Sequence, residues 1–260
     1  MIKMEIIDIH VHPRQDKELK EVENLINFAK KLNITRINFL GDVLYYGYHP
    51  NNEQIKKIND LTIKLVNKYP CFFSGFCFVN PEHDKKFIKQ EIERCIVKGN
   101  LKGIKLEASC NASDKRVFKV AEIAEKLNVP ILHHAWDTTN INSRWGPEVC
   151  QSDPEDIAIL AKKFPKVKII MAHLIACGVR GILEIKNFDN VWAEISGGQP
   201  VTGIMEYAVK KMGAERILFG SDCPGRDFSA QLSKVYGAKI TAREKELILG
   251  INAKNLLGLK

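Results

Sequence analysis

Short apolar runs alternate with amphipathic stretches along almost the whole chain. Eight of these runs are typical of buried β-strands, because they are brief, rich in Ile, Val, Leu and Phe, and bounded by turn residues. They lie at residues 6–12, 36–40, 72–79, 103–106, 130–134, 168–173, 191–195 and 217–221. The segments between them carry apolar residues at helical spacing, most clearly over residues 21–32, 86–97 and 117–127. The pattern therefore predicts strands and helices in alternation.

Nearly continuous apolar strands that alternate with helices indicate a (β/α)8 TIM barrel, built as a single domain over residues 1–260. The pair Asp153-Pro154 predicts a helix start, with Asp153 as the N-cap and Pro154 in the first turn. A doubly wound open sheet is the alternative. It is disfavoured because His10-Val11-His12 follows the first strand, where that fold places a glycine-rich phosphate-binding turn.

Composition narrows the class of protein. Hydrophobic residues make up 45% and charged residues 27% of the chain, as in ordinary globular proteins. No apolar stretch reaches the ~20 residues of a membrane span, and the N-terminus does not resemble a secretion signal, so we expect a cytoplasmic protein with no membrane partner. The seven cysteines include no Cys-x-x-Cys pair, which argues against disulfides and thiolate zinc sites. The net charge of +8 comes mostly from lysines interleaved with acidic residues, so no nucleic-acid partner is expected.

Polar residues stand where several predicted strands end. His10 and His12 alternate along the first strand, so their side chains point the same way and can bind one divalent metal ion. In a barrel of parallel strands the catalytic side chains gather at the carboxyl ends of the strands. The residues at these ends are His10, His12, His133, His134, His173 and Asp222. Histidines and a carboxylate that converge in this way, with a position left for water, are typical of a catalytic metal site.

The order of these motifs resembles the amidohydrolase superfamily, in particular its amidohydrolase family 2 branch of metal-dependent hydrolases, lactonases and aminocarboxymuconate semialdehyde-type decarboxylases. The resemblance runs over the whole chain. It consists of Asp-x-His-x-His at 8–12, Gly-Ile-Lys-Leu at 103–106, the run from Pro130 to His134, Met-Ala-His-Leu at 171–174, Gly-Ser-Asp at 220–222 and Ile-Asn-Ala-Lys-Asn-Leu-Leu at 251–257.

The resemblance implies roles for these residues. His10, His12, His134 and Asp222 would bind one divalent metal ion, with Zn²⁺ expected first and Mn, Fe, Co or Ni as alternatives. Asp222 would also take the proton of a metal-activated water, and His173 would act on the substrate as an acid, a base or an electrostatic partner. The implied reaction is attack of this water on a carbonyl carbon.

Several assignments stay open from the sequence. Strand alternation sends only one of His133 and His134 inward, and the family pattern favours His134. Lys105 is a candidate to anchor substrate, to pair with a buried carboxylate, or to form a carbamate bridge between two metal ions. Glu107 lies farther along and is expected in the loop, outside the ligand set.

Other residues are candidates for substrate binding or support. Arg144 lies in the long segment after the fifth predicted strand and Arg226 follows Asp222, so either guanidinium is placed to bind a carboxylate of the substrate. A solvent-facing arginine is the alternative for both. Asp8 is expected to support the strand or a ligand histidine rather than to bind metal.

We therefore expect a metal-dependent hydrolase of a small amide, ester or lactone. The alternative is a metal-dependent, non-oxidative decarboxylase of a small carboxylated substrate. A TatD-like deoxyribonuclease is disfavoured because Gly103-Ile104-Lys105-Leu106 stands where that family carries a glutamate. A barrel that has lost its metal and only binds ligands is a further alternative. It is disfavoured because such a barrel would lack His10, His12 or Asp222, and this chain has all three. The expected partner is a small-molecule substrate, with a homodimer as a further possibility.

Overall fold

The strands form a complete ring. The computed structural model describes residues 5–14, 20–139, 149–198 and 200–260. Its 8-stranded sheet is parallel throughout, and each strand hydrogen-bonds to the next one in the chain. The strands are β1 (Ile6–Val11), β2 (Ile34–Phe39), β3 (Phe73–Phe78), β4 (Gly103–Leu106), β5 (Ile131–His133), β6 (Ile169–Met171), β7 (Val191–Glu194) and β8 (Ile217–Leu218).

Hydrogen bonds between β1 and the chain that continues β8 close the ring. The amide of Ile9 donates to the carbonyl of Phe219 at 3.1 Å, and the amide of Asp222 donates to the carbonyl of His10 at 2.7 Å. A further parallel bridge joins Val11 to Cys223. The predicted (β/α)8 barrel is therefore confirmed, with all eight predicted strands present and their ends moved by two residues or fewer, except in the short β8.

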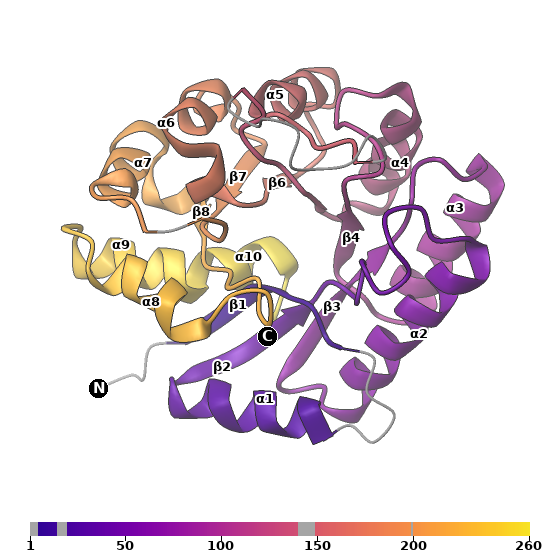
Figure 1. Cartoon of the computed structure of the whole chain (residues 1–260), viewed down its shortest axis with the longest axis horizontal. Coiled ribbons are helices and arrows are strands. Elements are labelled where there is room, and N and C mark those ends of the chain that lie inside the picture. Colours follow the sequence, from indigo (N-terminus) through magenta and orange to yellow (C-terminus); the bar gives the residue numbers. More distant parts are fainter. Residues whose placement is uncertain (1–4, 15–19, 140–148, 199) are drawn as a thin grey trace.

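Helices surround the barrel in Figure 1. The α-helices are α1 (Lys20–Lys31), α2 (Asn52–Lys68), α3 (Lys85–Glu93), α4 (Lys115–Leu127), α5 (Pro154–Lys163), α6 (Leu174–Ile185), α7 (Ile204–Met212), α8 (Phe228–Tyr236), α9 (Ala242–Glu246) and α10 (Asn252–Leu257). Three short turns of other helix types are η1 (Arg94–Lys98), η2 (Ala214–Arg216) and η3 (Leu247–Ile251). Among the described residues, no helix combines the length and the hydropathy that crossing a membrane requires.

The structure confirms one predicted helix start and corrects one predicted helix end. The Asp153 side chain caps α5 and Pro154 is its first residue, as predicted. The predicted helix over residues 86–97 differs, because regular α-helix ends at Glu93 and continues as the π-helical turn η1. This turn places Cys95 in the core, whereas Val97 is exposed.

Two apolar layers position the site. The larger one lies between the strands and the surrounding helices. The smaller one contains Ile7 and Ile9 of β1 together with inward residues of other strands, such as Leu132 and Ile170, and it is joined by α10. The register of β1 against β2 shifts between Asp8 and Val11. We infer that this irregularity lets the histidines that follow Ile9 also face inward, above an apolar floor.

Candidate metal centre and active-site cavity

A cavity of about 580 Å³ opens where the strands end. Its lining comes from the segments that follow β1, β2, β4, β5, β6 and β8, so residues far apart in the sequence meet there. The lining residues are His12, Arg14, Asp42, Val43, Leu44, Tyr45, Glu107, His134, Trp136, His173, Asp222, Pro224, Gly225 and Arg226. This position matches the carboxyl-terminal face at which TIM barrels carry out their chemistry.

His10 and His12 are each held by one ring nitrogen and turn the other toward the same point. The Nδ1 atom of His10 lies 2.8 Å from Oε2 of Glu194, and Nδ1 of His12 lies 2.7 Å from the carbonyl of Gly41. The two Nε2 atoms are 3.1 Å apart. Oδ1 of Asp222 lies 3.6 Å from each of them. The prediction that both rings point the same way is confirmed.

The donor and acceptor roles around His10 and His12 favour a bound cation. A carboxylate and a carbonyl can only accept, so both Nδ1 atoms carry the hydrogen and both Nε2 atoms present lone pairs. Burial, aided by the charge of Lys105, lowers the pKa of His12 to about 4, and burial lowers that of His10 well below its usual value. Burial, together with the charge of Glu194, raises the pKa of Asp222 to about 7, and in its ionised form this carboxylate faces the two lone pairs. A divalent metal ion fits this set of ligands.

The structure distinguishes the two neighbouring histidines of the fifth strand. His134 lines the cavity, and its Nδ1 lies 3.0 Å from Oε1 of Glu107. Its Nε2 is buried and has no hydrogen-bond partner among the residues that the structure describes. His133 points elsewhere: its Nδ1 contacts the carbonyl of His134 at 2.8 Å and the hydroxyl of Ser152 at 3.3 Å. The inward residue is thus His134. Its ring nitrogens do not join the compact group formed by His10, His12 and Asp222.

Lys105 and Glu107 form a buried ion pair at the edge of the cavity. The Nζ atom of Lys105 lies 2.8 Å from Oε2 of Glu107, and the Lys105 side chain is fully buried. Burial disfavours the Glu107 carboxylate, but Lys105 and His134 beside it still lower its pKa well below the usual value. Of the three roles considered for Lys105, the structure shows the pairing with a carboxylate. Glu107 follows the last residue of β4, in the loop as expected, and its side chain lines the cavity.

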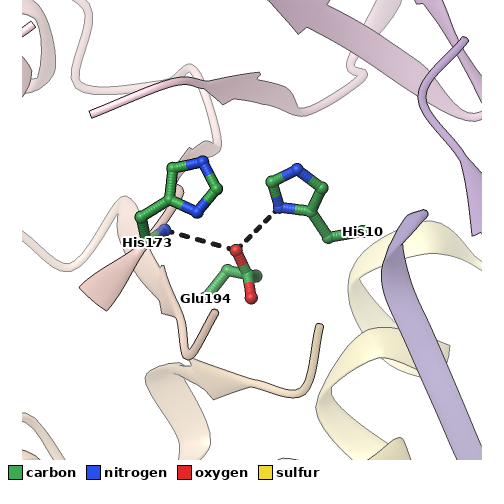
Figure 2. Close-up of side chains that lie close together, drawn as sticks. All are labelled: His10, His173 and Glu194. Carbon is green, nitrogen blue, oxygen red and sulfur yellow. Dashed lines mark hydrogen bonds and ion pairs between the residues drawn. The ribbon is translucent and has the colours of Figure 1, made fainter. Parts of the chain in front are cut away.

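Glu194 is a site residue that the sequence analysis did not identify. It ends β7 and is fully buried. Figure 2 shows its carboxylate between the ring of His10 and the backbone nitrogen of His173, which lies 3.3 Å from Oε2. The three residues also form a group whose atoms are close enough to hold a metal ion. Since this carboxylate already accepts hydrogen bonds from its neighbours, we interpret Glu194 as a support for His10. The strand-end rule applied to the seventh strand would have found it.

Two site residues adopt an unusual backbone conformation. Asp222 has φ 61° and His173 has φ 62°, in the left-handed region that side chains other than glycine rarely occupy. Such residues cluster at functional sites, where the surrounding structure holds them in place. Asp8 helps to hold Asp222, because its Oδ1 accepts from the amides of His10 and Ser221, each at 3.0 Å. The expected supporting role of Asp8 agrees with these contacts.

The two arginine candidates differ in what the structure describes. Arg226 lines the cavity, and its Nε lies 3.8 Å from Oδ2 of Asp222 and has no hydrogen-bond partner within the described part of the chain. Arg144 lies outside the described residues. Arg14, which follows His12 and Pro13, also lines the cavity although the sequence analysis did not select it. The cavity thus carries two guanidinium groups beside its cluster of metal-binding atoms.

Comparisons with known proteins identify the family and the fold of this chain. The model of a family described as amidohydrolase matches residues 7–259. A search of curated proteins finds no match. Among solved structures, 2,6-dihydroxybenzoate decarboxylase in complex with 2,6-dihydroxybenzoate is similar with a TM-score of 0.77 and 17% identity, over 100% of this chain and 99% of that one.

Two further structures are similar over nearly their whole length. The 5-carboxyvanillate decarboxylase from Sphingomonas paucimobilis has a TM-score of 0.76 and 14% identity, over 99% of this chain and 100% of that chain. The dihydroxybenzoic acid decarboxylase from Polaromonas, with bound manganese, has a TM-score of 0.73 and 18% identity, over 99% and 98%. At these identities the similarity shows the shared fold.

Proposed function

Because this chain belongs to the amidohydrolase family, we propose that it is a metal-dependent, non-oxidative decarboxylase of a small aromatic carboxylate. In this reaction the bond from the ring carbon to the carboxylate breaks, CO₂ leaves, and the ring carbon takes up one proton. The observation that carries the proposal is the converging set of His10, His12 and Asp222 in a cavity with aromatic and aliphatic walls.

The metal centre would use this chain's own donor set. His10, His12 and Asp222 would bind the ion, and the unpartnered Nε2 of His134 is the candidate for a fourth ligand. A divalent ion bound there supplies a Lewis acid that polarises oxygens of the substrate. Glu194 and Glu107 keep His10 and His134 in the orientation that ligation needs, as carboxylates commonly do for metal-binding histidines.

The walls of the cavity suit an aromatic acid. Val43, Leu44 and Tyr45 line the cavity from the segment after β2, and Trp136 lines it from the segment after β5. These side chains offer apolar contacts to a ring. The guanidinium groups of Arg14 and Arg226 would bind an acidic group of the substrate.

We propose that His173 moves the proton. Its ring centroid lies 5.0 Å from that of His10 and 5.8 Å from that of Trp136, so it borders both the metal-binding cluster and the proposed ring-binding wall. Burial, and then the charges of His134 and His10, keep its pKa well below the usual value. A neutral imidazole there would take a proton from solvent water and pass it to the ring carbon as CO₂ departs.

Decarboxylation and hydrolysis can be separated directly. The purified protein, loaded with Mn²⁺ or with Zn²⁺, would be incubated with 2,6-dihydroxybenzoate, 5-carboxyvanillate and other hydroxybenzoates, and CO₂ and the phenolic product would be measured. A parallel assay would use a lactone and an aryl ester. Release of CO₂ that is abolished in Asp222→Asn, but retained in His49→Ala at the surface, supports the proposal. Turnover of the lactone or ester alone, with the same dependence on Asp222, would instead establish the hydrolase that the sequence analysis placed first.

A further inference from the structure

A single buried carboxylate, that of Glu194, contacts both the metal-binding His10 and the loop that holds His173. Oε2 lies 2.8 Å from Nδ1 of His10 and 2.7 Å from the hydroxyl oxygen of Ser196. Oε1 accepts from the amide of Ser196 at 2.5 Å. Ser196 is fully buried, and its hydroxyl lies 2.8 Å from Nδ1 of His173. The four residues therefore form a continuous chain of hydrogen bonds.

The direction of each bond in this chain follows from the chemistry of the groups. A serine hydroxyl has one hydrogen to donate, and a carboxylate can only accept. The hydroxyl hydrogen of Ser196 therefore points at Glu194, so its oxygen must accept from Nδ1 of His173. In the neutral ring this leaves Nε2 of His173 without a hydrogen and on the far side of the ring from Ser196.

The backbone around Ser196 is shaped for this contact. The next residue, Gly197, has φ 82°, which favours glycine. A Cβ atom on Gly197 would lie 2.7 Å from Cβ of His173, so only glycine allows the loop after β7 to approach so closely. Lys234 of α8 also holds this loop, because its Nζ donates to the carbonyl of Gly197 at 3.1 Å.

We propose that Ser196 is a positioning residue that fixes the tautomer of His173, with hydrogen on Nδ1 and a lone pair at Nε2 available to the cavity. Glu194 then orients two histidines by two routes: His10 directly and His173 through Ser196. The routes are separable, since loss of the Ser196 hydroxyl frees His173 but leaves the contact between Glu194 and His10. The catalytic use of this lone pair rests on the proposed decarboxylase, whereas the tautomer itself does not.

The tautomer can be measured by ¹⁵N NMR of the histidine rings in the Zn²⁺-loaded protein. We expect wild type to show a protonated Nδ1 and an unprotonated Nε2 for His173, and Ser196→Ala to lose this pattern while binding the same amount of Zn²⁺. Ser152→Ala is the matched control, because Ser152 contacts His133, which points away from the cavity. Ser196→Cys tests the same point if the alanine variant does not fold, because a thiol is a weak hydrogen-bonding group.

Each outcome of this experiment either supports or overturns the proposed role of Ser196. A His173 signature that is unchanged in Ser196→Ala overturns the proposal, as does loss of Zn²⁺ from that variant, which would place Ser196 in support of the metal site instead. If the protein decarboxylates an aromatic acid, kcat of Ser196→Ala should fall about 10–100-fold with little change in KM. A changed tautomer in a protein without decarboxylase activity would refute the proposed function and leave the role of Ser196 intact.

Discussion

At the scale of single residues, the site depends on buried charges that neutralise one another. Lys105 and Glu107 are paired at 2.8 Å with almost no exposure to solvent. Glu107 in turn contacts Nδ1 of His134 at 3.0 Å. Removing one partner of such a buried pair leaves the other charge without compensation, which costs more than the pair itself contributes.

We predict that Glu107→Gln lowers the free energy of unfolding by about 3–5 kcal/mol, because the buried Lys105 side chain would lose its counter-charge. The double variant Lys105→Met, Glu107→Gln should recover much of this loss. Denaturant unfolding of the wild type and the three variants, Lys105→Met included, measures the coupling between the two side chains. Additive losses in the double variant would contradict the ion pair as the source of the effect.

The two histidines of the fifth strand offer a second comparison at this scale. His134→Ala should lower metal affinity, because it removes the buried, unpartnered Nε2 from the cavity. His133→Ala should lower stability but keep the metal, since its ring contacts Ser152 and a backbone carbonyl. Elemental analysis of both variants after dialysis checks this. Metal loss in His133→Ala alone would reverse the assignment.

At the scale of elements, neighbouring strands make room for the supporting carboxylates. Gly220, which follows β8, lies against Glu194 of β7, and a Cβ atom there would come within 2.5 Å of Oε1. The carboxylate that holds His10 therefore depends on the absence of a side chain on the neighbouring strand. This contact between the two strands therefore affects the position of His10, a proposed metal ligand.

Gly220→Ala should therefore displace Glu194 and lower metal affinity about 10–100-fold, the usual effect of disturbing a residue that supports a ligand. Gly103→Ala is a control for crowding alone, because its Cβ would meet the ring of Phe76 at 2.7 Å. Isothermal titration with Zn²⁺ compares the two. Equal affinity losses in both variants would attribute the effect to general strain in the barrel.

The packing of α8 against the loop after β7 predicts a dependence on pH. Burial lowers the pKa of Lys234 from 10.5 to about 8, although the charge of Glu194 opposes the shift. Between pH 8 and 10.5 the unfolded chain therefore binds more protons at this residue than the folded one, so the contribution of Lys234 to stability rises with pH. Below pH 8 the cost of burying the charge is fully present.

We expect the difference in unfolding free energy between Lys234→Met and wild type to shift by about 2–3 kcal/mol in favour of wild type between pH 7 and 10. Tyr236 also titrates at high pH, but it is present in both proteins and its effect cancels. Urea unfolding at several pH values measures the difference. A difference that does not change with pH would show that Lys234 titrates normally.

At the scale of the whole molecule, the proposed metal site joins β1 to the segment that follows β8. His10 lies in β1 and His12 directly after it, and Asp222 follows β8, next to the hydrogen bonds that close the barrel. A ligand that binds only the folded ring stabilises it against unfolding. A bound metal ion should therefore stabilise the closed barrel by joining its first and last strands.

Free Zn²⁺ at 100 times its Kd should stabilise the protein by about 2.7 kcal/mol and raise Tm by roughly 5–10 °C. The double variant His10→Ala, His12→Ala should show no shift. Thermal unfolding with and without a chelator makes the comparison. An equal shift in the double variant would place the stabilising metal elsewhere in the chain.

The sequence by itself determined the barrel. Each strand and each helix has its own period of apolar residues, and eight strands that alternate with helices are compatible with few folds other than the (β/α)8 barrel. The sequence also placed His10, His12, His173 and Asp222 at one rim, because parallel strands end together. Strand alternation left His133 and His134 open; the family pattern favoured His134, and the tertiary structure shows that it is His134 that lines the cavity. Tertiary structure alone decided that Glu107 and Glu194 turn inward to hold His134 and His10. The direction of each of these side chains depends on the twist of its strand end and on the space beside it, such as the space next to Gly220. The local sequence pattern contains no information about that space.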